Sequence, residues 1–178
     1  MSDTIDRLMQ RALEARRESR LDDAKRDLTE AVALCREAAA PGKLARALAG
    51  LGQAERDLHH NDAALRHYEE AVTLYRTEKD PLKLAHTIRH VADIHRHEGN
   101  QRLAEGCYEN ALGIYRQQPE TPPLDLANAL RGSALLKESL GEIEQARAQW
   151  QEAGKLYAEV CVEAGVAESK RRMELLKT

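Results

Sequence analysis

Four histidines gather in the stretch HTIRHVADIHRHEGN, residues 86–100, together with two arginines and an aspartate. His86 and His90 are four residues apart, and Asp93 or His97 follows about one helical turn later, which is an acceptable spacing for metal ligands. A histidine beside an aspartate could also transfer protons. A third reading makes the stretch one wall of a binding groove. The choice among the three depends on the elements that position these side chains.

A helical pattern occurs four times along the chain, at spacings of 40, 40 and 42 residues between the first alanines, Ala24, Ala64, Ala104 and Ala146. Each copy has an alanine, a bulky residue four positions later, an alanine three later and a bulky residue four later. These offsets place all four on one stripe of a helix. The four sets are Ala24-Leu28-Ala31-Cys35, Ala64-Tyr68-Ala71-Tyr75, Ala104-Tyr108-Ala111-Tyr115 and Ala146-Trp150-Ala153-Tyr157.

A proline-led motif precedes three of these stripes and marks the start of another helix. The motif reads PGKLA at 41–45, PLKLA at 81–85 and PLDLA at 123–127. Proline suits the first helical turn, where its missing N–H is not needed. Asp80 is placed to cap the helix that follows it, and Gly99 and Gly141 suit the left-handed position after a helix.

Each repeat is therefore predicted to be a helical hairpin. The predicted fold is all-α: a right-handed superhelical solenoid of four hairpins and a C-terminal capping helix. Ala, Leu, Glu, Arg, Lys and Gln dominate the composition, which favours helix. We expect one domain over residues 1–178. Its predicted parts are repeats at about 2–40, 41–80, 81–121 and 122–161, with the capping helix at about 162–177.

These repeats resemble the tetratricopeptide repeat family. The small–large–small residues of its second helix match Ala64, Tyr68 and Ala71, and its turn glycine matches Gly99 and Gly141. Its small residue midway along the first helix matches Ala12, Gly52, Ala92 and Ala134. A period of 40 to 42 residues, longer than the usual ~34, is similar to the long repeats of kinesin light chains and spindle-orientation adaptors.

The chain also departs from the family pattern in the first helix of each repeat. The family's early aromatic is replaced by Leu8, Leu48, Ile88 and Leu130. Its later tyrosine is replaced by Ala15, Glu55, His95 and Lys137. The last three could form a ladder between stacked helices, or each could be solvated at a repeat edge.

The histidine stretch divides into two faces when it is placed on a helix. At 100° per residue, six of its seven polar residues share one arc of about 120°. Those six are His86, Arg89, His90, Asp93, Arg96 and His97. His95 lies on the opposite, apolar side. In the resembled family, the six-residue face lines the concave groove.

The groove predicted from this register is basic, although the whole chain carries a net charge of −3. Arginine forks bind carboxylates through two hydrogen bonds, so we expect a non-enzymatic protein-interaction module that holds an acidic or carboxylate-bearing segment of a partner. Arg89 and Arg131 are the expected central anchors. If the histidines titrate normally, affinity should rise as pH drops through about 6.5. The predicted peptide-binding residues are Arg46, Gln53, Arg56, His86, Arg89, His90, Asp93, Arg96, Asn128 and Arg131.

Other classes of function receive less support from the sequence. Arg89 and Arg96 flank the alternative metal ligands His86, His90, Asp93 and His97, and cations disfavour a cation site, so we expect no metal or cofactor. No nucleophile or phosphate-binding loop accompanies the His–Asp pair, which argues against an enzyme. The groove lacks interleaved aromatics, which argues against nucleic acid. A ligand-sensing regulator and a self-associating scaffold remain alternatives.

The sequence also carries an expectation about compartment. Cys35, Cys107 and Cys161 are scattered and form no CxxC pair, as in reduced cytoplasmic proteins. The first residues, MSDTIDRLMQ, lack a signal-peptide pattern. No stretch of about 18 apolar residues occurs, so we expect a cytoplasmic location and no membrane partner.

Overall fold

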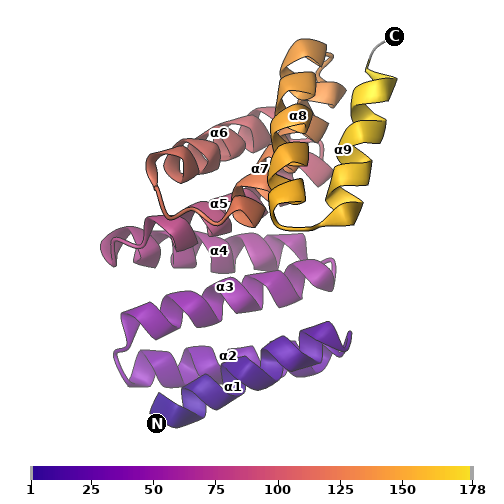
Figure 1. The fold of residues 1–178 in the computed structure, drawn as a ribbon. Helices are drawn as coiled ribbons and strands as arrows, with labels where there is room; N and C mark the ends of the chain where they lie inside the picture. The colour runs from indigo at the N-terminus through magenta and orange to yellow at the C-terminus, as the bar shows by residue number, and fades with distance from the viewer. Residues whose placement is uncertain (1, 177–178) are drawn as a thin grey trace. The chain divides into compact units, whose positions relative to one another are not determined.

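The computed structural model describes residues 2–176, and this part of the chain folds into helices joined by short turns (Figure 1). No strand occurs in that range, so the predicted all-α solenoid of helical hairpins is confirmed. The helices are α1 Ser2–Arg17, α2 Leu21–Glu37, α3 Pro41–Asp57, α4 Asn61–Thr77, α5 Pro81–His97, α6 Gln101–Gln117, α7 Pro123–Ser139, α8 Ile143–Glu159 and α9 Glu163–Leu175.

Local sequence explains where the helices begin and end. α3, α5 and α7 each begin at the proline of the repeated motif. The Asp80 carboxylate accepts a hydrogen bond from the backbone N–H of Lys83 at 3.1 Å, which confirms it as a helix cap. Gly99 and Gly141 have φ of 77° and 75°, the left-handed conformation that their positions predict.

The Ala/aromatic stripe forms the core, as predicted. The four alanine pairs of the repeats are fully buried, and Tyr68, Tyr108 and Trp150 are among the largest side chains that solvent does not reach. A small residue on the facing helix lets the two backbones approach. A Cβ atom added to Gly52 of α3 would lie 2.7 Å from the Tyr68 ring of α4. Glycine at this position is therefore a packing requirement.

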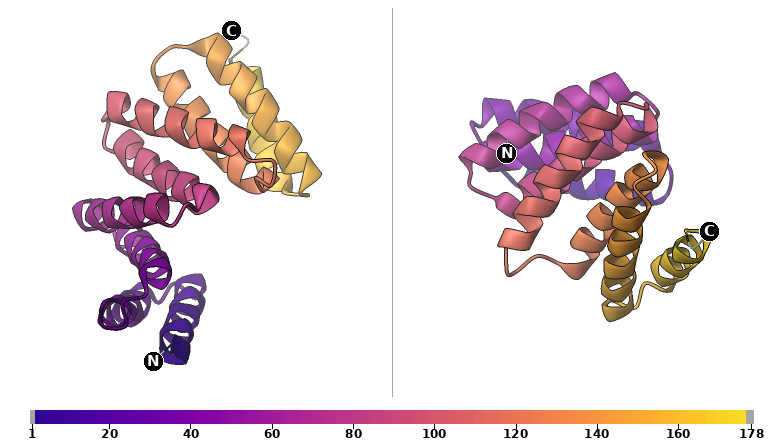
Figure 2. Two further views of the ribbon diagram at one scale, coloured as in Figure 1. Left: turned by 90° about the vertical axis from the view of Figure 1, so that its left-hand side faces the viewer. Right: turned by 90° about the horizontal axis from the view of Figure 1, so that it is seen from above.

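Cα packing divides the chain into two compact units, Met1–His90 and Val91–Thr178, which are described separately below. In the first unit, α1 packs on α2, α2 on α3 and α3 on α4. In the second unit, α6 packs on α7, α7 on α8 and α8 on α9. α5 begins in the first unit and ends in the second. Figure 2 shows consecutive helices of each hairpin running back along one another. The single-domain assignment remains a prediction.

Two further expectations concern the C-terminal helix and the possibility of a membrane-spanning segment. The predicted capping helix, about 162–177, coincides with α9, although residue 177 lies outside the described range. Within residues 2–176, no helix combines the length and the apolar character that a bilayer-spanning segment needs.

Candidate functional site

Six of the predicted groove residues lie in the first unit, on two helices. Arg46, Gln53 and Arg56 come from α3, and His86, Arg89 and His90 come from α5. Four of these six, Gln53, Arg56, His86 and Arg89, gather around the imidazole of His90, and Arg16 of α1 and Asp57 of α3 join them. We call this group the His90 cluster; it consists of Arg16, Gln53, Arg56, Asp57, His86, Arg89 and His90.

His90 is the centre of the cluster and is only 7% exposed. Its ring stacks on Tyr68 with centroids 5.8 Å apart and planes within 8°. Its Nδ1 lies 2.5 Å from a guanidinium nitrogen of Arg56. Its Nε2 lies 2.8 Å from Arg89 and 3.2 Å from Nε2 of His86. Since a guanidinium can only donate, the imidazole must offer at least one unprotonated nitrogen.

The charge state of His90 follows from these surroundings. Burial, followed by the charges of Arg89, His86, Arg56 and Arg16, holds the pKa of His90 well below its ordinary value of 6.5. The ring is therefore neutral at neutral pH and acts as a hydrogen-bond acceptor for arginine. His90 consequently does not supply the gain in affinity near pH 6.5 that its sequence context suggests.

Asp57 is the carboxylate of the cluster, and the sequence-based site did not include it. Arg16 donates to Asp57 Oδ2 at 2.8 and 3.1 Å, and Arg56 donates to Oδ1 at 2.9 and 3.2 Å. Burial alone would raise the pKa of Asp57, but the hydrogen bonds from both arginines bring it below its ordinary value. Arg16 also donates to the Gln53 amide oxygen at 2.5 Å. The 40-residue register contained a signal for Arg16, because Arg16 aligns with Arg56.

Arg46 stands apart from the cluster on an exposed part of α3. It borders a cleft of about 150 Å³ whose apolar lining includes Met9, Leu13 and Leu28. Gly50 also lines this cleft, and an added Cβ there would lie 3.0 Å from the Leu28 side chain. Gly50 aligns with His90 one repeat later, so the cleft exists where the next repeat has an imidazole.

The four predicted groove residues of the second unit are all engaged by neighbouring side chains. The Tyr108 hydroxyl donates to Asp93 at 2.6 Å and accepts from Arg96 at 3.3 Å. The Tyr157 hydroxyl donates to the Asn128 side chain at 2.8 Å.

Arg131, an expected central anchor, already has a carboxylate partner. It forms two hydrogen bonds with Glu168 of α9, at 2.6 and 2.9 Å. These bonds are the main reason that the pKa of Arg131 is raised and that of Glu168 is lowered. Glu168 was not among the predicted groove residues, so the sequence did not predict this contact.

The alternative metal site receives no structural support. Among residues 2–176, no group of three or more histidine, cysteine, aspartate or glutamate side chains is placed to hold a metal ion. His86 and His90 do meet, but Arg56 and Arg89 contact the same His90 ring, and Asp93 accepts a hydrogen bond from Tyr108.

Glu55 and Lys137 follow neither the ladder nor the solvated arrangement considered for them. Both are buried. Glu55 pairs with Lys25 of α2 at 3.0 Å and with His60, just after α3, at 2.8 Å. Lys137 pairs with Glu105 of α6 at 2.5 Å and with Glu142, just after α7, at 2.8 Å. Each is thus held by the preceding helix and by its own turn.

Comparisons with known proteins identify the fold. No family model matches the sequence. No curated protein matches it either. Among solved structures, the chain is similar to BtubC (BKLC) from P. vanneervenii, with a TM-score of 0.79, 18% sequence identity and coverage of 88% of this chain. The match spans 64% of the length of that protein. At this identity the likeness shows the fold alone: the chain is a helical-repeat protein.

Proposed function

We propose that the repeats are of the tetratricopeptide type, in the long 40–42-residue form, and that the protein is a cytoplasmic interaction module without catalytic activity. Its ligand is an acidic or carboxylate-bearing segment of a partner protein. The repeated Ala/aromatic stripe and the turn glycines support the family assignment. The free thiols of Cys35, Cys107 and Cys161 agree with a reducing compartment.

The His90 cluster is the observation that carries the proposed ligand chemistry. It brings Arg16, Arg56 and Arg89 from three helices to one buried, neutral imidazole. Asp57 accepts two hydrogen bonds from Arg56. The neutral ring of His90 accepts at one of its two nitrogens, which face Arg56 and Arg89, and so helps to orient one of these arginines. A guanidinium that is already oriented loses less conformational entropy when it binds an anion, and its fork geometry suits a carboxylate.

In this proposal the first unit supplies the principal anchors, Arg46, Arg56 and Arg89, with hydrogen bonds from Gln53 and His86, while His90 lies buried behind them. The corresponding polar residues of the second unit are held by Tyr108, Tyr157 and Glu168. Binding there would require an exchange of partners, as it also would at Arg56, which donates to Asp57.

Calorimetric titration of the whole protein with a hexaglutamate peptide tests the proposal, with hexaglutamine as the uncharged reference. We expect one-to-one binding to hexaglutamate that weakens as salt rises, because the attraction is between charges. Arg56→Gln and Arg89→Gln should each reduce affinity about tenfold to a hundredfold, the range expected for hydrogen bonds to charged groups.

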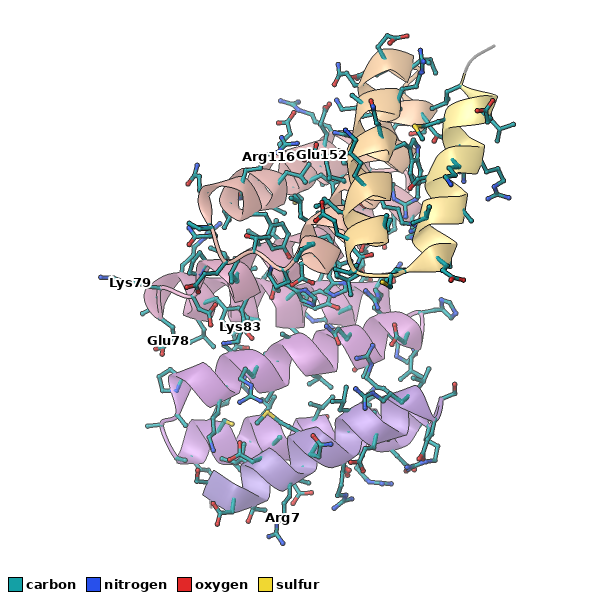
Figure 3. All side chains as sticks on the ribbon, viewed as in Figure 1. Arg7, Glu78, Lys79, Lys83, Arg116 and Glu152 are labelled. Carbon is teal, nitrogen blue, oxygen red and sulfur yellow. The ribbon has the colours of Figure 1, made fainter. Side chains whose placement is uncertain are left out.

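Arg116→Gln is the matched control, since Arg116 pairs with Glu152 between α6 and α8 of the second unit (Figure 3) and is not one of the predicted groove residues. This variant should bind like the wild type. Equal affinity in all three arginine variants, or no binding to hexaglutamate at millimolar concentration, would contradict the proposed ligand class.

A further inference from the structure

α9 is attached to the rest of the second unit with little apolar burial. Its buried residues are Gly165 and Ser169, neither of which has a sizeable apolar side chain. α7, in contrast, buries Leu130 and Leu136 among eight buried residues. Since apolar area removed from water is the main stabilising contribution to helix packing, α9, whose Val166 and Met173 are only half-buried, gains less from it than α7 does.

The contact between α9 and α8 is close only at small residues. A Cβ atom added to Gly165 would lie 2.5 Å from the Tyr157 ring, and one added to Gly154 of α8 would lie 3.1 Å from Ser169. Further along, the two helices leave a cleft of about 410 Å³ that Met173, Arg147 and Gln151 help to line. Figure 1 shows α9 lying beside α8 as the outer helix of this pair. The backbones therefore touch, but the side chains interlock little.

Two ion pairs give this attachment its specificity. Glu168 receives two hydrogen bonds from Arg131, and Arg172 donates to Glu138 at 3.0 Å. Glu138 is held in place by the indole N–H of Trp150. α7 thus presents a cation and then an anion, and α9 presents an anion and then a cation. A helix with that order of charges, running in that direction, forms both ion pairs.

We infer that the α7–α8 face of the second unit is a binding site for a partner helix that presents a small residue, a carboxylate three positions later and a guanidinium four positions after that. α9 fills this site in cis through Gly165, Glu168 and Arg172. A partner helix of the same pattern takes its place by competition. The inference does not rest on the acidic ligand of the first unit, because this site needs both signs of charge.

Competition is physically reasonable because an element with few buried apolar contacts opens more readily than the core. The tether gives α9 a local concentration in the millimolar range, so α9 holds the site unless a partner helix binds more tightly. Weakening either ion pair should shift the balance toward the partner. Both events can be measured in the whole protein.

Amide hydrogen exchange of the whole protein tests whether α9 opens by itself. We expect amides of α9 to exchange faster than those of α8. Glu168→Gln and Arg131→Gln should each accelerate exchange in α9 about twofold to fivefold while leaving α8 unchanged, because the pair is partly exposed. Arg116→Gln, which removes an ion pair between α6 and α8, should leave α9 unchanged. If α9 and α8 exchange at one rate in every variant, α9 is a fixed part of the core and the inference is wrong.

A labelled peptide with the sequence of residues 161–176 tests the site in trans by fluorescence anisotropy. It should bind whole-protein Glu168→Gln about twofold to fivefold more tightly than wild type, because the competing cis helix is weakened. The same peptide carrying Glu168→Gln, or the receptor Glu168→Gln/Arg131→Gln, should show weaker binding. Failure of the unmodified peptide to bind Glu168→Gln at millimolar concentration would overturn the inference, as would equal binding by all receptors. Neither result bears on binding of hexaglutamate to Arg56 and Arg89.

Discussion

The two units bury an ion pair at the same repeat position but with opposite signs. In the first unit the buried group is the carboxylate Glu55, with Lys25 as its principal cation. In the second unit the buried group is the ammonium of Lys137, with Glu105 as its principal anion. Burial would raise the pKa of Glu55 and lower that of Lys137, but hydrogen bonds from their partners reverse both shifts.

This difference shows that the fold requires any charge at this position to be paired, whereas each repeat determines the sign of that charge. The fold brings a residue near the end of the first helix against the preceding helix and against the turn that follows, so a charge placed there must be paired. It does not require a particular sign. The sign instead makes each helix pair selective, since Lys25 would repel Lys137, and Glu105 would repel Glu55, if the partners were exchanged.

Reversing one of these charges should give the largest effect on stability. Glu55→Lys places an ammonium beside Lys25 in a buried position and should lower the free energy of unfolding by about 3 kcal/mol, as expected when a buried charge loses its partner. Adding Lys25→Glu recreates the arrangement of the second unit and should restore most of the loss. Urea unfolding measures both values.

The mirror experiment in the second unit is Lys137→Glu with and without Glu105→Lys. It should show the same loss and the same recovery. A double variant no more stable than its single variant, in either unit, would mean that the pairing across helices is not what stabilises this position.

A second comparison concerns Gly50, His90 and Gly132, which align in successive repeats. Gly132→Ala would place a Cβ 2.6 Å from the hydroxyl oxygen of Tyr108, whose buried ring is held by Asp93 and Arg96. This overpacking should cost about 2 kcal/mol. Gly50→Ala meets only the flexible end of Leu28 at 3.0 Å. The preference of alanine for helix, about 1 kcal/mol, should offset that contact.

Thermal unfolding of the two glycine variants checks this prediction. The melting temperature of Gly132→Ala should fall clearly, whereas that of Gly50→Ala should stay close to wild type. A similar change in both would show that the Tyr108 ring can move aside.

His90, the third member of this set, makes stability depend on pH. Its pKa in the folded protein is well below 6.5, whereas an unfolded imidazole titrates near 6.5. Between these values the unfolded chain binds more protons, so the free energy of unfolding falls as pH drops below about 6.5. Burial also lowers the pKa of His67, which adds to the same loss. The groups that face His90 are Arg16, Gln53, Arg56, His86 and Arg89.

The prediction is that His90→Gln loses less stability than wild type between pH 7 and pH 5, although the variant starts from a lower value at pH 7. Denaturant unfolding across this pH range gives both curves. Parallel curves would show that the imidazole at position 90 does not release a proton on folding.

Sequence patterns predicted the fold because the same helical pattern occurs in each of the four repeats. The stripe from Ala64 to Tyr75 and the prolines of α3, α5 and α7 confine each helix independently of its neighbours. Partner choice within the site was harder to predict. A helical wheel places Arg89 and Arg131 on a groove face, but it cannot show that Glu168 reaches Arg131 from a helix 37 positions away.

The sequence likewise did not predict that part of the polar face of α5, at His90, would be buried. The wheel put His90 among exposed groove residues. Its ring is buried because it stacks on Tyr68 of the preceding hairpin, and that contact depends on how adjacent hairpins pack. Asp57 was missed for a related reason: its role arises from Arg16, which lies two helices earlier.

The smallest expected effect comes from a comparison of the turns. Two turns of the second unit have glycine in the left-handed conformation, Gly99 and Gly141, and a third has Cys161 with φ of 57°, whereas all four turns of the first unit have residues other than glycine there. Those residues are Ser19, Ala39, His59 and Lys79, with φ between 47° and 64°. A side chain in this conformation costs about 1–2 kcal/mol, of which glycine recovers part because it is more flexible when unfolded.

Lys79→Gly should therefore raise the free energy of unfolding by about 0.5–1 kcal/mol. The Lys79 side chain points outward from the turn, so little packing is lost (Figure 3). Gly99→Ala should lower stability by a similar amount, because an added Cβ meets no atom within 4 Å and only the backbone conformation is penalised. Urea unfolding of both variants decides the matter. If Lys79→Gly lowers the free energy of unfolding, the contacts of the lysine side chain contribute more than the backbone strain costs. The left-handed residues in the turns of the first unit would then stabilise these turns through their side chains.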